Sequence, residues 1–77
     1  MSKQKIEDCI KASLEDYFVD LGEEQPHSIY DMVMQTVERP LLESVMERAH
    51  QNQSVAAGLL GINRNTLRKK LQIHGLL

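Results

Sequence analysis

Residues 51–77 of this sequence carry four basic side chains and no carboxylate, the bases being Arg64, Arg68, Lys69 and Lys70. Residues 1–50 hold all eleven acidic residues and five basic ones, so the net charge is −6 there and +4 in residues 51–77. The basic end suits a polyanion such as nucleic acid, and the acidic part would repel the same partner and orient the encounter. A solvated helix face has the same charge pattern and remains the alternative.

The segment that contains these bases has the spacing of a helix-turn-helix motif. Ala57 is followed four residues later by Gly61, and six residues after that by Leu67. A small side chain lets two short helices cross closely, and a glycine can adopt the positive φ of a tight turn. A structural helical hairpin shares this spacing and is the alternative. The apolar residues predicted to line the inner side are Leu60, Ile62, Leu67 and Leu71.

The polar side chains of the second helix fall into sets suited to different parts of DNA. A helix-turn-helix directs the amino end of its second helix towards base edges, and Asn63 and Arg64 lie there. Arginine can form two hydrogen bonds with guanine, and asparagine can do so with adenine. A helical wheel places Asn65 and Lys69 opposite the apolar seam, with Thr66, Arg68 and Lys70 on the flanks, where they suit phosphates.

Four helices are predicted to position these side chains. Apolar residues recur with the helical period, and glycines and polar turns separate the segments. Pro40 removes one backbone donor from the second segment, which predicts either a bend in one long helix or two shorter helices. No alternation typical of strands is found, so the predicted fold class is all-α. The predicted helices span about residues 6–21, 29–49, 53–60 and 64–73.

The second predicted helix has an apolar stripe too wide to be covered by one neighbouring helix. A chain of 77 residues with the single cysteine Cys9 has no intramolecular disulfide and a small core, and a homodimer would relieve that shortage. We therefore predict dimerisation helices in residues 1–50 and a helix-turn-helix in residues 51–77, within one compact domain. The predicted dimer or core residues are Val33, Val37, Pro40, Leu41, Leu42, Val45 and Met46.

Other functional classes find little support in the residue patterns. His27, His50 and His74 lack the spacing of metal ligands and are predicted to lie on the surface, whereas Cys9 is predicted to lie in the core. The adjacent carboxylates occupy polar faces or a loop, and no nucleophile elbow or phosphate-binding glycine motif occurs. The polar N-terminus is unlike a signal peptide. We expect a cytosolic protein without enzymatic activity, cofactor, metal or membrane contact.

Three runs of the sequence resemble the Fis family (factor for inversion stimulation): GINRNTLRKKL, ERPLLESVM and ASLEDYF. The similarity extends from about residue 6 to residue 75. The last run of residues also resembles the C-terminal domains of enhancer-binding activators. The upstream RPLLESVM segment, and a chain that starts at Met1 with no room for an ATPase, favour Fis.

The resemblance implies an intertwined homodimer of four-helix subunits that binds and bends double-stranded DNA. A bacterial, nucleoid-associated transcriptional regulator in the cytoplasm is the implied role. By motif match, the implied base contacts are Asn63, Arg64 and Lys69, and the implied backbone contacts are Asn52, Ser54, Thr66, Arg68 and Lys70.

Two departures from the family pattern limit what the resemblance implies. Family members that activate recombinases carry an N-terminal β-hairpin arm, whereas about five residues precede the first predicted helix, so a recombinase contact is not expected. His50, Val55, Gln72 and Ile73 replace bases that flank the motif elsewhere, which predicts weaker phosphate binding. The alternative function is a dimeric protein-interaction module that uses its acidic surface and binds DNA weakly.

Overall fold

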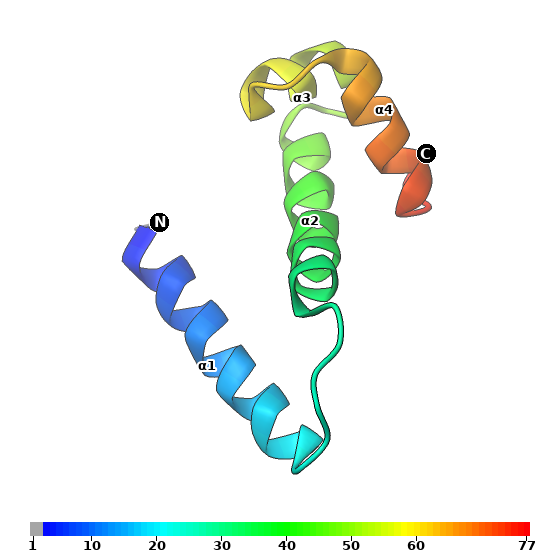
Figure 1. Ribbon diagram of the computed structural model, residues 1–77. Coiled ribbons are helices and arrows are strands. Elements are labelled where there is room, and N and C mark those ends of the chain that lie inside the picture. Colours follow the sequence, from blue (N-terminus) through cyan, green and yellow to red (C-terminus); the bar gives the residue numbers. More distant parts are fainter. Residues whose placement is uncertain (1–2) are drawn as a thin grey trace.

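The computed structural model describes residues 3–77, and all the regular structure in that range is helical. The all-α prediction is confirmed, and the first helix begins three residues before its predicted start at residue 6. Figure 1 shows α1 leaning away from α2, with α3 and α4 gathered at the far end of α2. The helices in chain order are α1 (Lys3–Leu21), α2 (Ile29–Arg48), α3 (Gln53–Leu60) and α4 (Arg64–Ile73).

Gly61 makes the turn between α3 and α4. It adopts φ 73° and ψ 30°, and its N–H donates to the carbonyl of Ala57 at 2.9 Å. The N–H of Ile62 donates to the same carbonyl at 3.1 Å, so the last turn of α3 is closed by the hydrogen-bond pattern typical of a glycine C-cap. The positive φ predicted for this position is confirmed.

The start of α2 has the residue pattern of a side-chain cap without the cap itself. Ser28, followed by Asp31, has the pattern of a side-chain cap, but Ser28 adopts φ 51° and ψ 42° and its side chain makes no capping hydrogen bond. An N-cap side chain reaches the first turn from an extended backbone, and the left-handed conformation of Ser28 is not extended. The side chain of Ser28 therefore does not cap α2.

Pro40 lies inside α2, which runs unbroken from Ile29 to Arg48. The alternative of two shorter helices is wrong, while the bend at Pro40 stays a prediction. Because proline has no N–H, the carbonyl of Thr36 loses its usual helical donor at this position. The hydroxyl of Thr36 donates to the carbonyl of Met32 at 2.7 Å.

The link between α2 and α3 contains two successive residues with positive φ, His50 at 53° and Gln51 at 65°. The N–H of Gln51 donates to the carbonyl of Met46 at 2.8 Å, which closes the end of α2. This conformation is unfavourable for a residue with a Cβ atom, so the link stores backbone strain.

The core of the described chain lies where α3 and α4 meet the second half of α2. α1 contributes no buried residue, and Cys9, predicted to be a core residue, is exposed. Among residues 3–77, no helix is long and apolar enough to span a membrane, and no cluster of three or more potential metal ligands occurs. The buried residues are Leu42, Met46, Ala49, Ala56, Ala57, Leu67 and Leu71.

Candidate nucleic-acid interface

The contact between α3 and α4 has the packing that the motif spacing predicts. Ala57 is 5% exposed, and Leu67 and Leu71 of α4 are fully buried beside it. Leu60 and Ile62 pack against this cluster from its edge. The apolar face of α4 is therefore fixed, and its polar face is turned outwards.

Asparagines cap both helices of the motif. The Asn52 side-chain oxygen accepts a hydrogen bond from the Val55 N–H at 3.1 Å, and the Asn63 oxygen accepts one from the Asn65 N–H at 2.7 Å. Both asparagines have the extended backbone expected at an N-cap. Their amide N–H₂ groups remain as donors beside the amino ends of α3 and α4, where an anion is also favoured by the helix dipole.

Arg64 joins the two helices at the amino end of α4. Its Nη1 donates to the hydroxyl oxygen of Ser54 on α3 at 3.3 Å, and both residues are exposed. A guanidinium group has five N–H donors, so this bond orients Arg64 and leaves donors for another acceptor. The structure thus brings together Asn63, Arg64 and Ser54, which the sequence placed in two different sets of DNA contacts.

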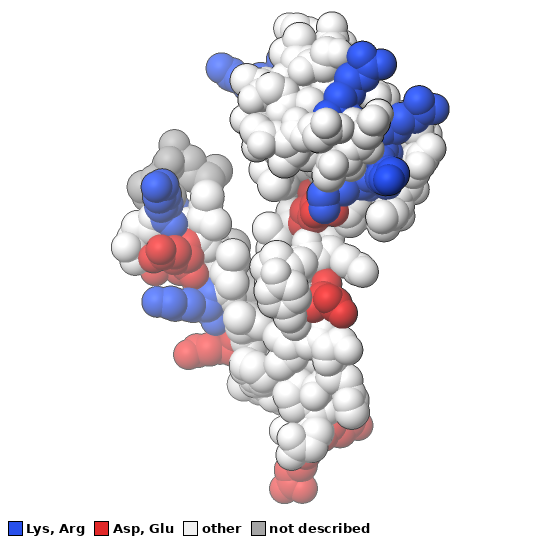
Figure 2. Space-filling view, turned by 45° about the horizontal axis from the view of Figure 1, so that its top comes forward, with Lys and Arg blue, Asp and Glu red and all other residues white. Residues whose placement is uncertain are grey.

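The outer and flanking positions of α4 divide into exposed and half-buried groups. Thr66, Arg68 and Lys69 are exposed, whereas Lys70 is half-buried. Figure 2 shows one group of basic side chains over the part of the molecule formed by α3 and α4, and others beside the acidic side chains of α1; most of the acidic side chains lie away from the first group. The separation of charge along the sequence is therefore also a separation in space.

Lys70 and His74 bind the same carboxylate of α2. Lys70 Nζ lies 2.8 Å from Glu38 Oε2, and His74 Nε2 lies 2.9 Å from Glu38 Oε1. Arg39 Nη1 also donates to the carbonyl of His74, at the C-terminal end of α4. The hydrogen bond from Lys70, followed by that from His74, holds the pKa of the Glu38 carboxyl below its ordinary value.

This cluster corrects one sequence prediction and adds residues that sequence reasoning missed. The His74 side chain is only 8% exposed, so its prediction as a surface residue is wrong. The apolar neighbours of His74 in sequence gave no sign of a partner. His74 follows Lys70 by four residues, which puts both side chains on the same side of α4. Their partner Glu38, however, is more than thirty residues away in the chain.

The residues predicted for the dimer or core are divided by the structure. Leu42 and Met46 belong to the buried core, Val33 and Val45 are half-buried, and the rest are exposed. A groove between α1 and α2 is lined mainly by apolar side chains, with Ile10, Leu14 and Tyr17 on one wall. The exposed members of the predicted set are Val37, Pro40 and Leu41.

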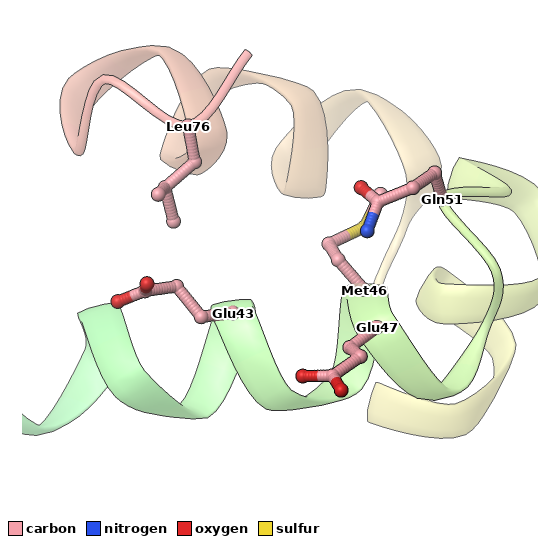
Figure 3. Close-up of a pocket in the computed structure, with 5 residues that line it drawn as sticks. All are labelled: Glu43, Met46, Glu47, Gln51 and Leu76. Carbon is pink, nitrogen blue, oxygen red and sulfur yellow. The ribbon is translucent and has the colours of Figure 1, made fainter.

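A further depression lies between the second half of α2 and the C-terminus. Figure 3 shows Leu76 facing Glu43 across it, with Met46, Glu47 and Gln51 at its far end. None of the predicted DNA contacts lines this depression. Its two carboxylates would oppose the approach of a phosphate, so it does not extend the candidate interface.

Comparison with known proteins identifies the same class of molecule. The family model described as "Bacterial regulatory protein, Fis family" matches residues 33–73. A "Putative Fis-like DNA-binding protein" of Ralstonia nicotianae is 65% identical over 77 residues and covers all of both chains. A protein of the same description from Neisseria meningitidis serogroup A is 57% identical over 72 residues, covering 94% of this chain and 91% of the relative. A "DNA-binding protein Fis" of Aliivibrio fischeri is 40% identical over 76 residues, covering 99% of this chain and 78% of the relative.

Proposed function

The chain belongs to the Fis family of bacterial regulatory proteins, and we propose that it is a homodimer that binds and bends double-stranded DNA as a nucleoid-associated regulator of transcription. The observation that carries this proposal is the orientation of α4. Its apolar face is buried, and its amino end presents Asn63 and Arg64 beside α3. The exposed bases Arg68 and Lys69 follow on the same helix, where they can meet the polyanion.

The side chains at the amino end of α4 are proposed to read bases. Arg64 is oriented by Ser54 and keeps donors for the two acceptors of a guanine edge. Asn63 uses its oxygen for capping, so its amide N–H₂ is the group available to a base. Lys69 is a further groove contact on the exposed face of α4.

The backbone contacts are proposed to come from both helices of the motif. Asn52 and Ser54 lie at the amino end of α3, and Thr66 and Arg68 lie on exposed positions of α4. Such contacts fix the position of the protein on the duplex without reading its sequence. Lys70 differs from these four because it is ion-paired with Glu38 and reaches a phosphate only if that pair opens.

Dimerisation is proposed because the N-terminal half of the chain has no core of its own. α1 has no buried residue, and the apolar side chains of Phe18 on α1 and of Val37 and Leu41 on α2 are between 37% and 48% exposed. Burial of these side chains in a second copy is worth about 25 cal/mol for each Å² removed from water. An obligate dimer has no stable monomer, so its unfolding midpoint depends on protein concentration.

Bending is proposed from the resemblance to Fis dimers, which are expected to hold their two DNA-reading helices closer than the roughly 34 Å repeat of DNA. Straight DNA then cannot meet both helices, and the cost of bending depends on central base pairs that no side chain touches. Duplexes that differ only in the central five base pairs test this step. Equal affinity for A·T-rich and G·C-rich centres would contradict bending.

Two measurements test the proposed function as a whole. Sedimentation at micromolar concentration should show a dimer, and a folded monomer would contradict the quaternary part. Fluorescence anisotropy with labelled duplexes should give a log–log salt slope of about −2 to −4, because with Lys70 paired to Glu38 roughly two to four charged phosphate contacts per dimer remain, at about 0.9 each. A slope near zero would instead favour the protein-interaction module.

A further inference from the structure

Lys70 is the base of residues 51–77 that faces the body of the protein. It follows Leu67 by three residues and precedes Leu71, so it lies beside the buried seam of α4 and away from the exposed Asn65 and Lys69. Its Nζ atom is 2.8 Å from Glu38 Oε2, with 36% of the Lys70 side chain and 27% of the Glu38 side chain exposed. This lysine therefore already has an anionic partner.

We propose that Glu38 is a specificity-determining residue, because it holds Lys70 off the phosphate backbone and so limits binding to DNA of any sequence. The inference rests on the DNA binding proposed above. Glu38 itself contacts no DNA and acts through its ion pair with Lys70. A phosphate contact adds affinity equally for every sequence, so one contact fewer per subunit lowers background binding and leaves base readout unchanged.

The geometry of Glu38 favours a closed pair over an exchange with phosphate. Both of its oxygens are bonded, one by Lys70 and the other by His74. Arg39 holds the carbonyl of His74, which fixes the end of α4 against α2. Release of Lys70 would leave the carboxylate half-buried with one bond fewer, an outcome that costs free energy. A phosphate would give Lys70 one ion pair comparable to the one that it loses with Glu38.

The base-reading end of α4 is far from this pair along the helix. Arg64 lies six residues before Lys70 and is oriented by Ser54 on α3. An α-helix rises 1.5 Å per residue, so about 9 Å separate the two positions along the axis. Changes at Glu38 should therefore alter the affinity for random DNA more than the discrimination between bases made by Arg64.

The test compares salt slopes on a random-sequence duplex for charge-matched variants. Glu38→Gln removes the carboxylate charge that holds Lys70. Glu43→Gln is its control, because Glu43 also lies on α2 and pairs with Arg39 at 3.5 Å but does not touch Lys70. Fluorescence anisotropy between 50 and 200 mM salt gives the slope for each. Circular dichroism of the same samples reports folding.

Glu38→Gln should steepen the slope by about 0.9 per subunit, or about 1.8 per dimer, relative to wild type. Over this fourfold salt range, the variant should lose about ten times more affinity than wild type does. Glu43→Gln should leave the slope unchanged and alter only the overall affinity. Addition of Lys70→Gln to Glu38→Gln should restore the wild-type slope.

A second pair of variants decides the question even if Glu38→Gln does not fold. Lys70→Gln alone should leave the slope on random DNA unchanged, whereas Arg68→Gln should flatten it by about 1.8 per dimer. Equal flattening by the two variants would show that Lys70 already binds phosphate and would overturn the inference. An unchanged slope in folded Glu38→Gln would overturn it too. Absence of DNA binding by wild type at low salt would overturn the proposed function itself, and the inference with it.

Discussion

Arg64 and Arg68 provide a direct test of how α4 divides base reading from backbone binding. Both are exposed arginines of α4, so replacement by alanine removes the same charge in each case. Arg64 stands at the amino end of the helix and is oriented by Ser54, whereas Arg68 is placed on a flank. We expect Arg64→Ala to reduce specificity and Arg68→Ala to reduce affinity for all sequences alike.

The expected magnitude follows from one guanine contact per subunit. A bidentate arginine–guanine pair contributes about 1–3 kcal/mol of discrimination, so two half-sites give about 2–6 kcal/mol per dimer. Since about 1.4 kcal/mol corresponds to a factor of ten, the loss on a bound site is roughly 30-fold or more. On random DNA, both variants should lose only the affinity that one positive charge per subunit contributes.

The assay is competition anisotropy with a bound site, the same site with the contacted guanines replaced, and a random duplex. For wild type, replacement of the guanines should weaken binding, and for Arg64→Ala it should have no further effect. For Arg68→Ala, the relative affinities for the three duplexes should stay at their wild-type values. If Arg64→Ala keeps the wild-type relative affinities as well, Arg64 contacts only the DNA backbone, and the proposed base contact by α4 is wrong.

Three further predictions concern stability, measured at one protein concentration. Leu67→Ala should lower the free energy of unfolding in urea by about 2–5 kcal/mol, and the exposed Leu59→Ala by less than about 0.5 kcal/mol; similar costs would contradict the packing. The pKa of Glu38 is lowered in the folded state, so its carboxylate should stabilise wild type above pH 4.5 and lose this contribution as the pH falls further. Glu38→Gln should lack this pH dependence, and the same dependence in both proteins would contradict the role of Glu38. Gln51→Gly should raise the free energy of unfolding by about 0.5–1 kcal/mol, because it relieves a φ of 65°, whereas Gln35→Gly inside α2 should lower it; a drop for both would rule out strain at Gln51.

The helices could be predicted because their signals are local. Apolar period and glycine stops act within a few residues, and α3 and α4 have the bounds that the sequence predicts. The turn at Gly61 follows from the need for a positive φ. Ser28 shows where a local pattern fails, because it is followed by Asp31 at the spacing of a cap but adopts a left-handed conformation and makes no capping hydrogen bond.

The Glu38 cluster could not be predicted from the same signals. Its members come from α2 and from the C-terminal end of α4, which are brought together by the packing of Leu42, Met46 and Ala49 against the motif. Charge counting placed Glu38 in the acidic part and Lys70 in the basic part, as if they were opposite ends of the molecule. In the structure Glu38 and Lys70 form an ion pair, so the acidic and basic regions are in contact where these two residues meet.

Cys9 illustrates the second limit of sequence reasoning, which is that an apolar pattern does not say which chain will cover it. The periodic spacing in α1 correctly predicts a helix, but no residue of that helix is buried in the described chain, and Cys9 is exposed. The apolar face meets only the open groove beside α2. Burial of this face in a second copy is consistent with both the helical pattern and the exposure.

α2 then has two roles that constrain each other. Its first half lines the groove proposed for dimerisation, and its second half supplies Leu42 and Met46 to the core that holds the helix-turn-helix. Glu38 lies between these parts and fixes the far end of α4. Because α2 is one continuous helix from the groove to the core, the geometry of the proposed dimer would set the separation of its two α4 helices. If the proposed dimer bends DNA, packing along α2, far from any base contact, would therefore determine the curvature.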